Sequence, residues 1–355
     1  MNMEFPEKIS QHILELMDKL KNKYGEESKE YNALYNQYVM TDNEKTHIQE
    51  GNLKHYEAGL VNNDIANNVE RLYRRQLVVE LTMACAAHCR YCLRSNYYKK
   101  QITRKEIDII VQYCNSDKDL KEILITGGDP FLVPQLLKYF ITELSDKAKN
   151  IKIIRIGTRL PVQDPRRFDQ DLFSFFKSYA ERFIFEVAVQ INHVVEIDEE
   201  SIKIFQELIN AKVKIYSQNV LLKGVNDDIT SLIDLYDELR YLGIEAHYLF
   251  HAVPIKGMYH FRCSINRAIE LIASLTSSGM ISGRIKPMLS LMTDVGKVTL
   301  YEGVLKEKDD QGYFTIKTKY SLKERMKWNP SYKIPSSAFV DDDGYINVKY
   351  LDGNL

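Results

Sequence analysis

The sequence predicts an α/β protein whose centre is a parallel β-sheet. From about Gln76 onward, short runs of β-branched and aromatic residues alternate with amphipathic stretches of about ten to fifteen residues. Strands that alternate with helices are typical of crossover units, and such units build parallel sheets. Six units of about thirty residues each fit a full or partial (β/α) barrel. A doubly wound open sheet fits the same periodicity, so both architectures stay open at this level.

The expected elements follow one another in a regular order. Strands are expected at residues 78–83, 122–126, 151–157, 183–189, 213–221 and 244–250, and helices at residues 104–115, 132–146, 168–180, 198–211, 229–242 and 264–278. Apolar residues have helical spacing in HILELMDKLKNKYG, so we expect a helical N-terminal extension over residues 1–72. The barrel then covers residues 73–285.

Residues 286–355 have a different character. We expect two strands, KVTLYEG and YFTIKTKY, on either side of the polar turn KEKDDQG, which predicts an antiparallel β-hairpin. The segment from KWNPSYKIPSSAF onward contains Pro, Ser and Asp, and it predicts an irregular tail.

The composition excludes several classes of function. The 355 residues include 48 Lys and Arg against 49 Asp and Glu, which gives a formal charge of -1. A neutral chain offers no electrostatic basis for binding nucleic acid. The sequence also lacks a run of about eighteen apolar residues that could span a membrane, and its start lacks the apolar core of a secretion signal. We therefore expect a cytoplasmic protein with a small-molecule substrate.

Three of the five cysteines lie close together, directly after the first expected strand. Cys85, Cys89 and Cys92 are spaced C-x3-C-x2-C in ACAAHCRYC. Three thiolates leave one position of a metal centre open, which is how a catalytic site is built. The alternative is a structural zinc site with His88 as fourth ligand, in a non-catalytic barrel that serves as a binding scaffold. The other two cysteines fall on helical patterns and are expected to be buried: Cys114 and Cys263.

A glycine-rich turn, Thr126-Gly127-Gly128-Asp129-Pro130, follows the second expected strand. Glycine lets a backbone approach a ligand closely, so the turn can offer N–H and C=O groups to it. A plain strand-to-helix turn, with Pro130 near the helix start, is the alternative interpretation.

Together with Tyr91 just before the last cysteine, these motifs resemble the radical S-adenosylmethionine (SAM) superfamily. The resemblance implies that the three thiolates hold a [4Fe-4S] cluster, whose open iron takes the amino and carboxylate groups of SAM. It also implies that reduction releases a 5′-deoxyadenosyl radical, which abstracts hydrogen from the substrate. The Gly127–Asp129 turn would then contact SAM.

Residues 76 to about 280 resemble the lysine 2,3-aminomutase family more narrowly. The matching stretches are CRYCLRS, ILITGGDPF, RIGTRLPV, NHVVEIDEES, SQNVLLKGVND and MYHFRCS. Nearly all lie at the carboxyl ends of expected strands, where barrel enzymes place their active sites. The resemblance implies a partial (β/α)6 barrel and an aminomutase-like isomerase that acts on a small substrate with an amino or carboxylate group.

Further side chains at these strand ends are candidates for binding or catalysis. The expected catalytic residues are Arg94, His251 and Tyr248, and the expected cofactor-binding residues are Tyr91, Gly127, Gly128, Asp129, Arg155, Arg159, Gln218, Asn219 and Lys297. In the resembling family the arginine at the position of Arg94 holds the substrate carboxylate, which suits a planar bidentate donor. For the others, a structural ion pair, a satisfied buried amide or a packed ring is the alternative role.

The chain departs from the family where pyridoxal phosphate would be held. The family binds this cofactor as a Schiff base, through a lysine in a glycine-rich segment. Here RIKPMLSLMTDVGKVTLYEG is shorter and has Gly296 before Lys297, with Lys286 as the other local lysine. Two reactions stay open: a pyridoxal-phosphate-dependent 1,2-amino shift, and a radical isomerisation, dehydrogenation or decarboxylation without that cofactor.

A second departure concerns the substrate. Lysine-specific members place an acidic residue ahead of the HFR triplet, and Val253 occupies the matching position here. An apolar side chain cannot pair a buried ammonium group, which is costly to desolvate. The sequence therefore argues against lysine as substrate. The expected partner is an external one-electron reductant of the flavodoxin or ferredoxin type, and a homo-oligomer stays open.

Overall fold

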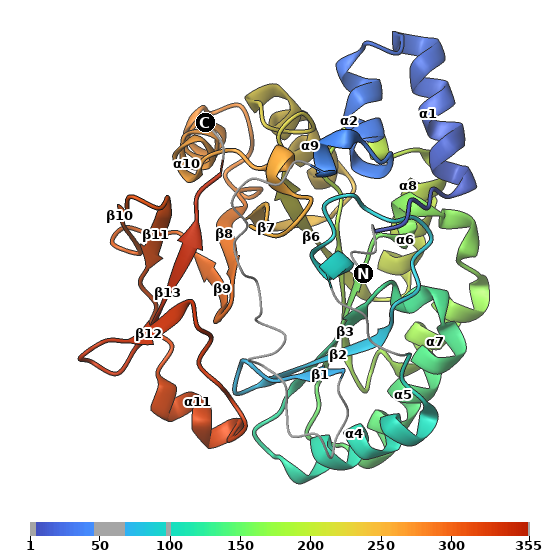
Figure 1. Cartoon of the computed structure of the whole chain (residues 1–355). Helices are drawn as coiled ribbons and strands as arrows, with labels where there is room; N and C mark the ends of the chain where they lie inside the picture. Colours follow the sequence, from blue (N-terminus) through green and yellow to red (C-terminus); the bar gives the residue numbers. More distant parts are fainter. Residues whose placement is uncertain (1–4, 46–67, 97–100, 354–355) are drawn as a thin grey trace.

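A computed structural model describes residues 5–45, 68–96 and 101–353 and contains a curved nine-stranded sheet (Figure 1). Its strands are β1 Val69–Glu70, β2 Gln76–Thr82, β3 Glu122–Gly127, β4 Ile153–Thr158, β5 Ile184–Val189, β6 Val213–Leu221, β7 Glu245–His251, β8 Met288–Thr293 and β9 Gly296–Thr299. Neighbours from β2 to β8 pair in parallel and in chain order, while β1 and β9 pair antiparallel at the two edges. Because the strand order never reverses and the edges do not pair, the sheet is a partial barrel and not a doubly wound sheet.

Each of the six connections between parallel strands contains one long helix, which lies outside the curved sheet (Figure 1). These helices are α4 Arg104–Ser116, α5 Pro134–Lys147, α7 Gln170–Tyr179, α8 Glu199–Asn210, α9 Ile229–Tyr241 and α10 Ile265–Ser277. All six expected strand–helix units are therefore confirmed. Polar residues cap most of the helix starts; for example, Thr103 and Glu106 form a capping box at α4. No helix in the described residues could cross a membrane on grounds of length and apolarity.

Alternating residues on each strand divide the molecule into a core and a lumen. On β4, Ile154 and Ile156 are buried in the main hydrophobic cluster against the helices. Arg155 pairs with glutamates of the neighbouring strands and Gly157 lines a cavity, so both face the concave side. The strand period of two thus places polar groups inside the half-barrel and aliphatic groups outside it.

The N-terminal extension packs over the cysteine loop. Its described part holds α1 Gln11–Tyr24 and α2 Lys29–Tyr38, but β1 Val69–Glu70 of the barrel sheet also lies within the range expected to be helical. The expectation for residues 46–67 lies outside the described residues. Apolar residues of α1 and α2 form one cluster with Ala87, and Cys89 packs against it. This segment of the chain therefore borders the place where the chemistry is expected.

The C-terminal region differs from the expected hairpin and irregular tail. KVTL forms β9, which pairs with β8 through a tight turn and not with YFTI. The segment KEKDDQG is not all turn: its first three residues belong to β10 Leu305–Lys308, and only DDQG joins β10 to β11 Tyr313–Ile316. The tail adds α11 Leu322–Trp328, β12 Ala338–Val340 and β13 Ile346–Leu351. The second sheet has the order β10-β11-β13-β12. Alternating apolar residues of β13 (Ile346, Val348 and Tyr350) bury against the barrel edge, which overrides the loop-like composition before them.

Candidate active site

One cavity of about 270 Å³ lies at the carboxyl ends of the parallel strands. Its lining includes Cys85, Cys89, Cys92, Tyr91, Arg94, Gly127, Gly128, Asp129, Arg159, Gln218, His251, Val253 and Lys297. The structure thus brings the cysteine loop, the glycine turn and most of the expected strand-end residues to one place. Three of the expected residues do not line it: Arg155, Asn219 and Tyr248.

The three cysteines follow β2 in a loop that the N-terminal segment holds. The backbone N–H of His88 donates to Lys8 O over 2.7 Å, and that of Arg90 donates to Gln37 O over 2.8 Å. Burial raises the pKa of the Cys85 and Cys92 thiols, with smaller contributions from neighbouring thiols. Both thiols must therefore lose a proton when a metal binds.

The spacing of the three sulfurs does not fit a single metal ion. Among the described residues, the sulfur atoms of Cys85, Cys89 and Cys92 do not all lie within 4.8 Å of one another. Thiolates on one tetrahedral zinc would be about 3.8 Å apart, given a Zn–S bond of about 2.3 Å. His88 also faces the N-terminal segment, because its Nδ1 lies 2.8 Å from Pro6 O and its ring stacks on Phe5. Among the described residues, the cysteines and His88 therefore do not form a ready four-ligand zinc site.

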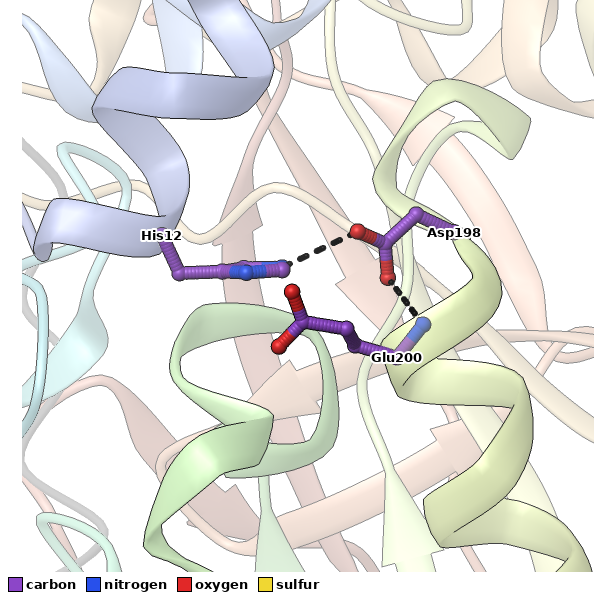
Figure 2. Close-up of side chains that lie close together, drawn as sticks. All are labelled: His12, Asp198 and Glu200. Carbon is purple, nitrogen blue, oxygen red and sulfur yellow. Dashed lines mark hydrogen bonds and ion pairs between the residues drawn. The ribbon is translucent and has the colours of Figure 1, made fainter.

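A different set of possible metal ligands, His12, Asp198 and Glu200, has its ligand atoms within 4.8 Å of one another, at the contact between α1 and α8 (Figure 2). The Nε2 atom of His12 lies 3.6 Å from Asp198 Oδ2, and Glu200 lies beside them. Both carboxylates have structural roles, because Asp198 Oδ1 caps α8 and Glu200 binds Arg166. None of the three lines the cavity. We interpret the group as a tether between the N-terminal extension and the barrel.

The glycine turn is shaped by the backbone beside it. A Cβ at Gly128 would overlap Ala84 O and lie 2.6 Å from the carbonyl carbon of Met83. The Gly128 N–H donates to Thr82 O over 2.5 Å, and the Asp129 N–H donates to Ala84 O over 2.7 Å. These two N–H groups are therefore engaged within the protein, and the carbonyl groups of the turn are what it can still offer to SAM. The glycines bring the end of β3 against the strand that leads into the cysteine loop.

Asp129 likewise binds the protein itself. Its Oδ2 accepts hydrogen bonds from Thr158 Oγ1 and from the backbone N–H groups of Arg159 and Leu160, and its Oδ1 accepts one from Phe131 N–H. Burial raises the pKa of this carboxyl group, and the hydrogen bonds oppose that shift. The Asp129 side chain thus ties the end of β3 to the end of β4, so a SAM contact of this turn would come from its backbone.

Replacing Gly128 with alanine is expected to reduce the free energy of unfolding by about 3 kcal/mol, because the added methyl group overlaps rigid backbone. The variant should also bind less iron, since residues 82–84 lead into the cysteine loop. Gly283→Ala is the matched control, because a Cβ at Gly283 meets nothing within 4 Å. Urea unfolding and iron analysis measure both effects. Equal stability of the two variants would contradict the close approach.

Each of the three expected arginines already has an acidic partner. Arg94 Nε lies 2.9 Å from Glu80 Oε1. Arg155 contacts Glu122 and Glu186 at 2.9 Å each, deeper in the lumen. Arg159 pairs with the fully buried Glu196. A buried cation needs such a partner, so these carboxylates explain why the arginines are tolerated inside the barrel.

Lys297 is different, because no described carboxylate lies within ion-pair distance of its Nζ. The lysine is on β9, and its Nζ lies 5.3 Å from the ring centre of Tyr248 and 5.6 Å from that of Phe250. Burial, followed by the charge of Arg155, lowers the pKa of Lys297 to about 8. The other candidate, Lys286, is exposed and donates to Thr276 O. Only Lys297 is placed on the cavity.

The remaining candidates divide between the cavity and the packed core. The Nε2 of Gln218 is buried and has no hydrogen-bond partner in the described structure, so it is available to a ligand. Asn219 is fully buried on the other face of β6, where its amide donates to Ile191 O and accepts from Tyr236. The Tyr248 ring packs at a tilt against the rings of His247 and Phe250 and lies near Lys297 Nζ.

His251 borders the cavity, but both of its ring nitrogens are occupied. Its Nδ1 lies 3.0 Å from Tyr350 Oη, and its Nε2 lies 2.8 Å from Cys263 O. A carbonyl oxygen can only accept, so Nε2 carries the proton and Nδ1 accepts from the tyrosine. Burial lowers the pKa of His251 to about 3. The ring therefore stays neutral and anchors β13, which differs from the expected catalytic role.

The sequence interpretation missed the partners of these residues. Glu80, Glu122 and Glu186 occupy lumen positions of otherwise apolar strands, and such alternation was the available signal. No feature of the sequence marks Gln37 as a functional residue, because amide side chains are common on polar helices such as α2. In the fold it is fully buried and contacts Tyr91 and Arg159.

Comparison with known proteins defines the class. Residues 79–236 match the radical SAM superfamily, over the strands and loops that build the cavity. Together with the cysteine loop and the partial barrel, this match identifies residues 79–236 as a radical SAM domain. That family implies a [4Fe-4S] cluster and SAM as cofactors.

Within that superfamily, the chain is lysine 2,3-aminomutase-like. A putative L-lysine 2,3-aminomutase of Aquifex aeolicus is 33% identical over 243 residues, which is 66% of this chain and 64% of the relative. The glutamate 2,3-aminomutase of Clostridioides difficile is 30% identical over 221 residues, which is 61% of this chain and 51% of the relative. The chain thus matches less than two thirds of either relative's length. Among solved structures, a radical SAM methyltransferase from Sphaerobacter thermophilus gives a TM-score of 0.48 at 18% identity, over 64% of this chain and 69% of that one.

Proposed function

We propose that the chain is a radical SAM isomerase that binds its cluster through Cys85, Cys89 and Cys92 and its SAM in the adjoining cavity. The observation that carries the proposal is the set of three cysteines on one cavity at the carboxyl ends of a partial barrel. The unpartnered Nε2 of Gln218 on the same cavity fits a bound polar ligand. When bound, the cluster and SAM supply a radical that abstracts hydrogen from the substrate.

The protein's own residues would orient the substrate and keep water out. Arg94 is held by Glu80 and by Thr126 Oγ1 at 3.2 Å, and we assign to it the substrate carboxylate, as the family resemblance implies. Gln218 would donate to SAM or to the substrate. Val253 lines the cavity and offers no charge to a distal ammonium group. A small amino acid without such a group is the substrate class that fits.

Pyridoxal phosphate fits Lys297 as its attachment point. Imine formation needs an uncharged amine, and a pKa of about 8 makes the amine available near neutral pH. Burial and the nearby charge of Arg155 favour the uncharged amine, whereas the rings of Tyr248 and Phe250 near Nζ favour the ammonium form and oppose this shift. We therefore favour a pyridoxal-phosphate-dependent amino shift over a radical reaction without that cofactor.

Anaerobic reconstitution tests the proposed function directly. The full chain should bind iron and sulfide, each near four per chain, with a brown chromophore. On reduction in the presence of SAM it should form 5′-deoxyadenosine, with dithionite in place of the natural one-electron reductant. Stoichiometric zinc without SAM cleavage would reject the proposal in favour of a non-catalytic scaffold.

Lys297 should react with pyridoxal phosphate at a pH where ordinary lysines do not. At pH 8 about half of the Lys297 amines are uncharged, compared with well under about 1% for a lysine of ordinary pKa. Borohydride trapping followed by peptide mass spectrometry should place the pyridoxyl group on Lys297, with a yield that rises through about pH 8. Lys286→Ala should leave the yield unchanged and Lys297→Ala should remove it. Labelling that is spread over surface lysines would contradict the assignment.

A further inference from the structure

Arg159 points a buried cation at one of the three cluster-binding sulfurs. It begins the short helix α6 Leu160–Gln163 at the end of β4, and it is 6% exposed. Its Nη1 donates to Cys89 Sγ over 3.0 Å and also contacts the Tyr91 hydroxyl. Gln163 Nε2 reaches the same sulfur at 3.4 Å. Cys89 therefore has a charged and a neutral donor directed at its sulfur.

The cation is held in place from two directions. Its Nη2 pairs with the buried carboxylate of Glu196, and that carboxylate also accepts from the backbone N–H of Asn192 over 2.7 Å. From the other side, Gln37 Oε1 accepts from Arg159 Nη2 over 3.2 Å, and Gln37 Nε2 donates to Glu196 over 3.2 Å. A fork with both ends bound cannot swing away from the sulfur without breaking several hydrogen bonds.

Gln37 belongs to α2, so the N-terminal extension is part of this arrangement. Its Oε1 also accepts from the Tyr91 hydroxyl over 3.1 Å, which connects α2 to the cysteine loop itself. Tyr38 of the same helix places its ring 5.3 Å from the Arg159 guanidinium. The helical extension therefore encloses the cation and keeps it dry, which strengthens its electrostatic effect.

The potential of an iron–sulfur cluster depends on hydrogen bonds to its sulfurs, on the nearby charge and on exposure to solvent. A fixed cation that donates to a ligand sulfur stabilises added negative charge, so it favours the reduced cluster. Glu196 opposes this effect, but it contacts the far nitrogen of the guanidinium and not the sulfur. The positive charge of Arg159, which is nearer to the sulfur, therefore has a larger effect on the cluster potential than the negative charge of Glu196.

We propose that Arg159, positioned by Glu196 and by Gln37 of the N-terminal extension, raises the reduction potential of the cluster through its hydrogen bond to Cys89. The inference rests on the proposed function, since it requires a cluster at the three cysteines. Arg159 is a positioning residue that acts through a cluster ligand, and it is not available for the anionic groups of SAM. The extension thereby gains a role in setting how easily an external one-electron donor reduces the enzyme.

A redox titration of the reconstituted full chain, followed by electron paramagnetic resonance without SAM, tests the proposal. The double variant Arg159→Gln with Glu196→Gln removes both charges and so leaves neither buried alone. The reduction potential of its cluster should lie at least about 59 mV below that of the wild type, which corresponds to a tenfold change in the equilibrium constant for one electron. Gln37→Leu and Arg159→Lys should shift the potential in the same direction by less. Arg166→Gln is the matched control, since this exposed arginine pairs with Glu15 and Glu200 away from the cavity, and its potential should equal that of the wild type.

A double variant that binds four irons and titrates at the wild-type potential would overturn the inference. Where the double variant does not fold, Gln37→Leu and Arg159→Lys decide, and an unchanged potential in both overturns it equally. These outcomes leave the proposed function intact, because the wild type still assembles its cluster. A wild-type chain without any cluster would instead reject the proposed function itself.

Discussion

Cys89→Ala is expected to abolish both iron binding and SAM cleavage. The remaining two thiols cannot hold the three irons that need protein ligands, so iron should fall to background and 5′-deoxyadenosine should not form. Cys89 is only partly buried, so the apoprotein should keep its fold, which far-ultraviolet circular dichroism can verify.

Cys114→Ala is the matched control for this prediction. Cys114 is fully buried in the main hydrophobic cluster and does not line the cavity. Its replacement should leave the iron content and SAM cleavage at wild-type levels. Full iron loading of the Cys89→Ala variant would show that the cluster, or another metal, binds elsewhere.

Glu196→Ala is expected to destabilise the apoprotein by about 3–5 kcal/mol, because it leaves the Arg159 guanidinium buried without its carboxylate. Two backbone N–H groups, those of Asn192 and His193, lose an acceptor at the same time. Urea unfolding measures the change in the free energy of unfolding.

The matched control for Glu196 is Glu200→Ala, which breaks an ion pair at the surface. Glu200 is partly exposed and its partner Arg166 is exposed, so solvent replaces the lost contact and the stability should change little. If both variants lose the same stability, the burial of the Arg159–Glu196 pair is not what makes it important.

Most of the fold could be predicted because its signals are local. Each of the six helices begins within two residues of the expected position, as α9 does at Ile229, because capping residues and apolar spacing lie within the segment itself. The exception was the end of the chain. The composition of KVTL predicts a strand but not its partner. It pairs with β8 and not with YFTI because of a tight turn and burial against the barrel.

The candidate site was predictable in its motifs but not in its contacts. The cysteine loop and the glycine turn are contiguous, so their place after strands β2 and β3 could be inferred from the strand pattern alone. The roles of Asp129, His251 and Asn219 could not, because each hydrogen-bonds to groups that are distant in the sequence. His251, for example, contacts Tyr350, which is 99 residues away.

The sequence by itself thus determined the order of strands and helices, the family resemblance and the three cysteines, because contiguous residues encode all of these. Only the tertiary structure decided which charged groups are free and which are paired. It placed Lys297 on the cavity with no acidic partner among the described residues and left Lys286 outside. It also brought Gln37 within hydrogen-bonding distance of Arg159 across 122 residues. The physical reason is that a buried charge is defined by its neighbours, and in a barrel those neighbours come from different strands.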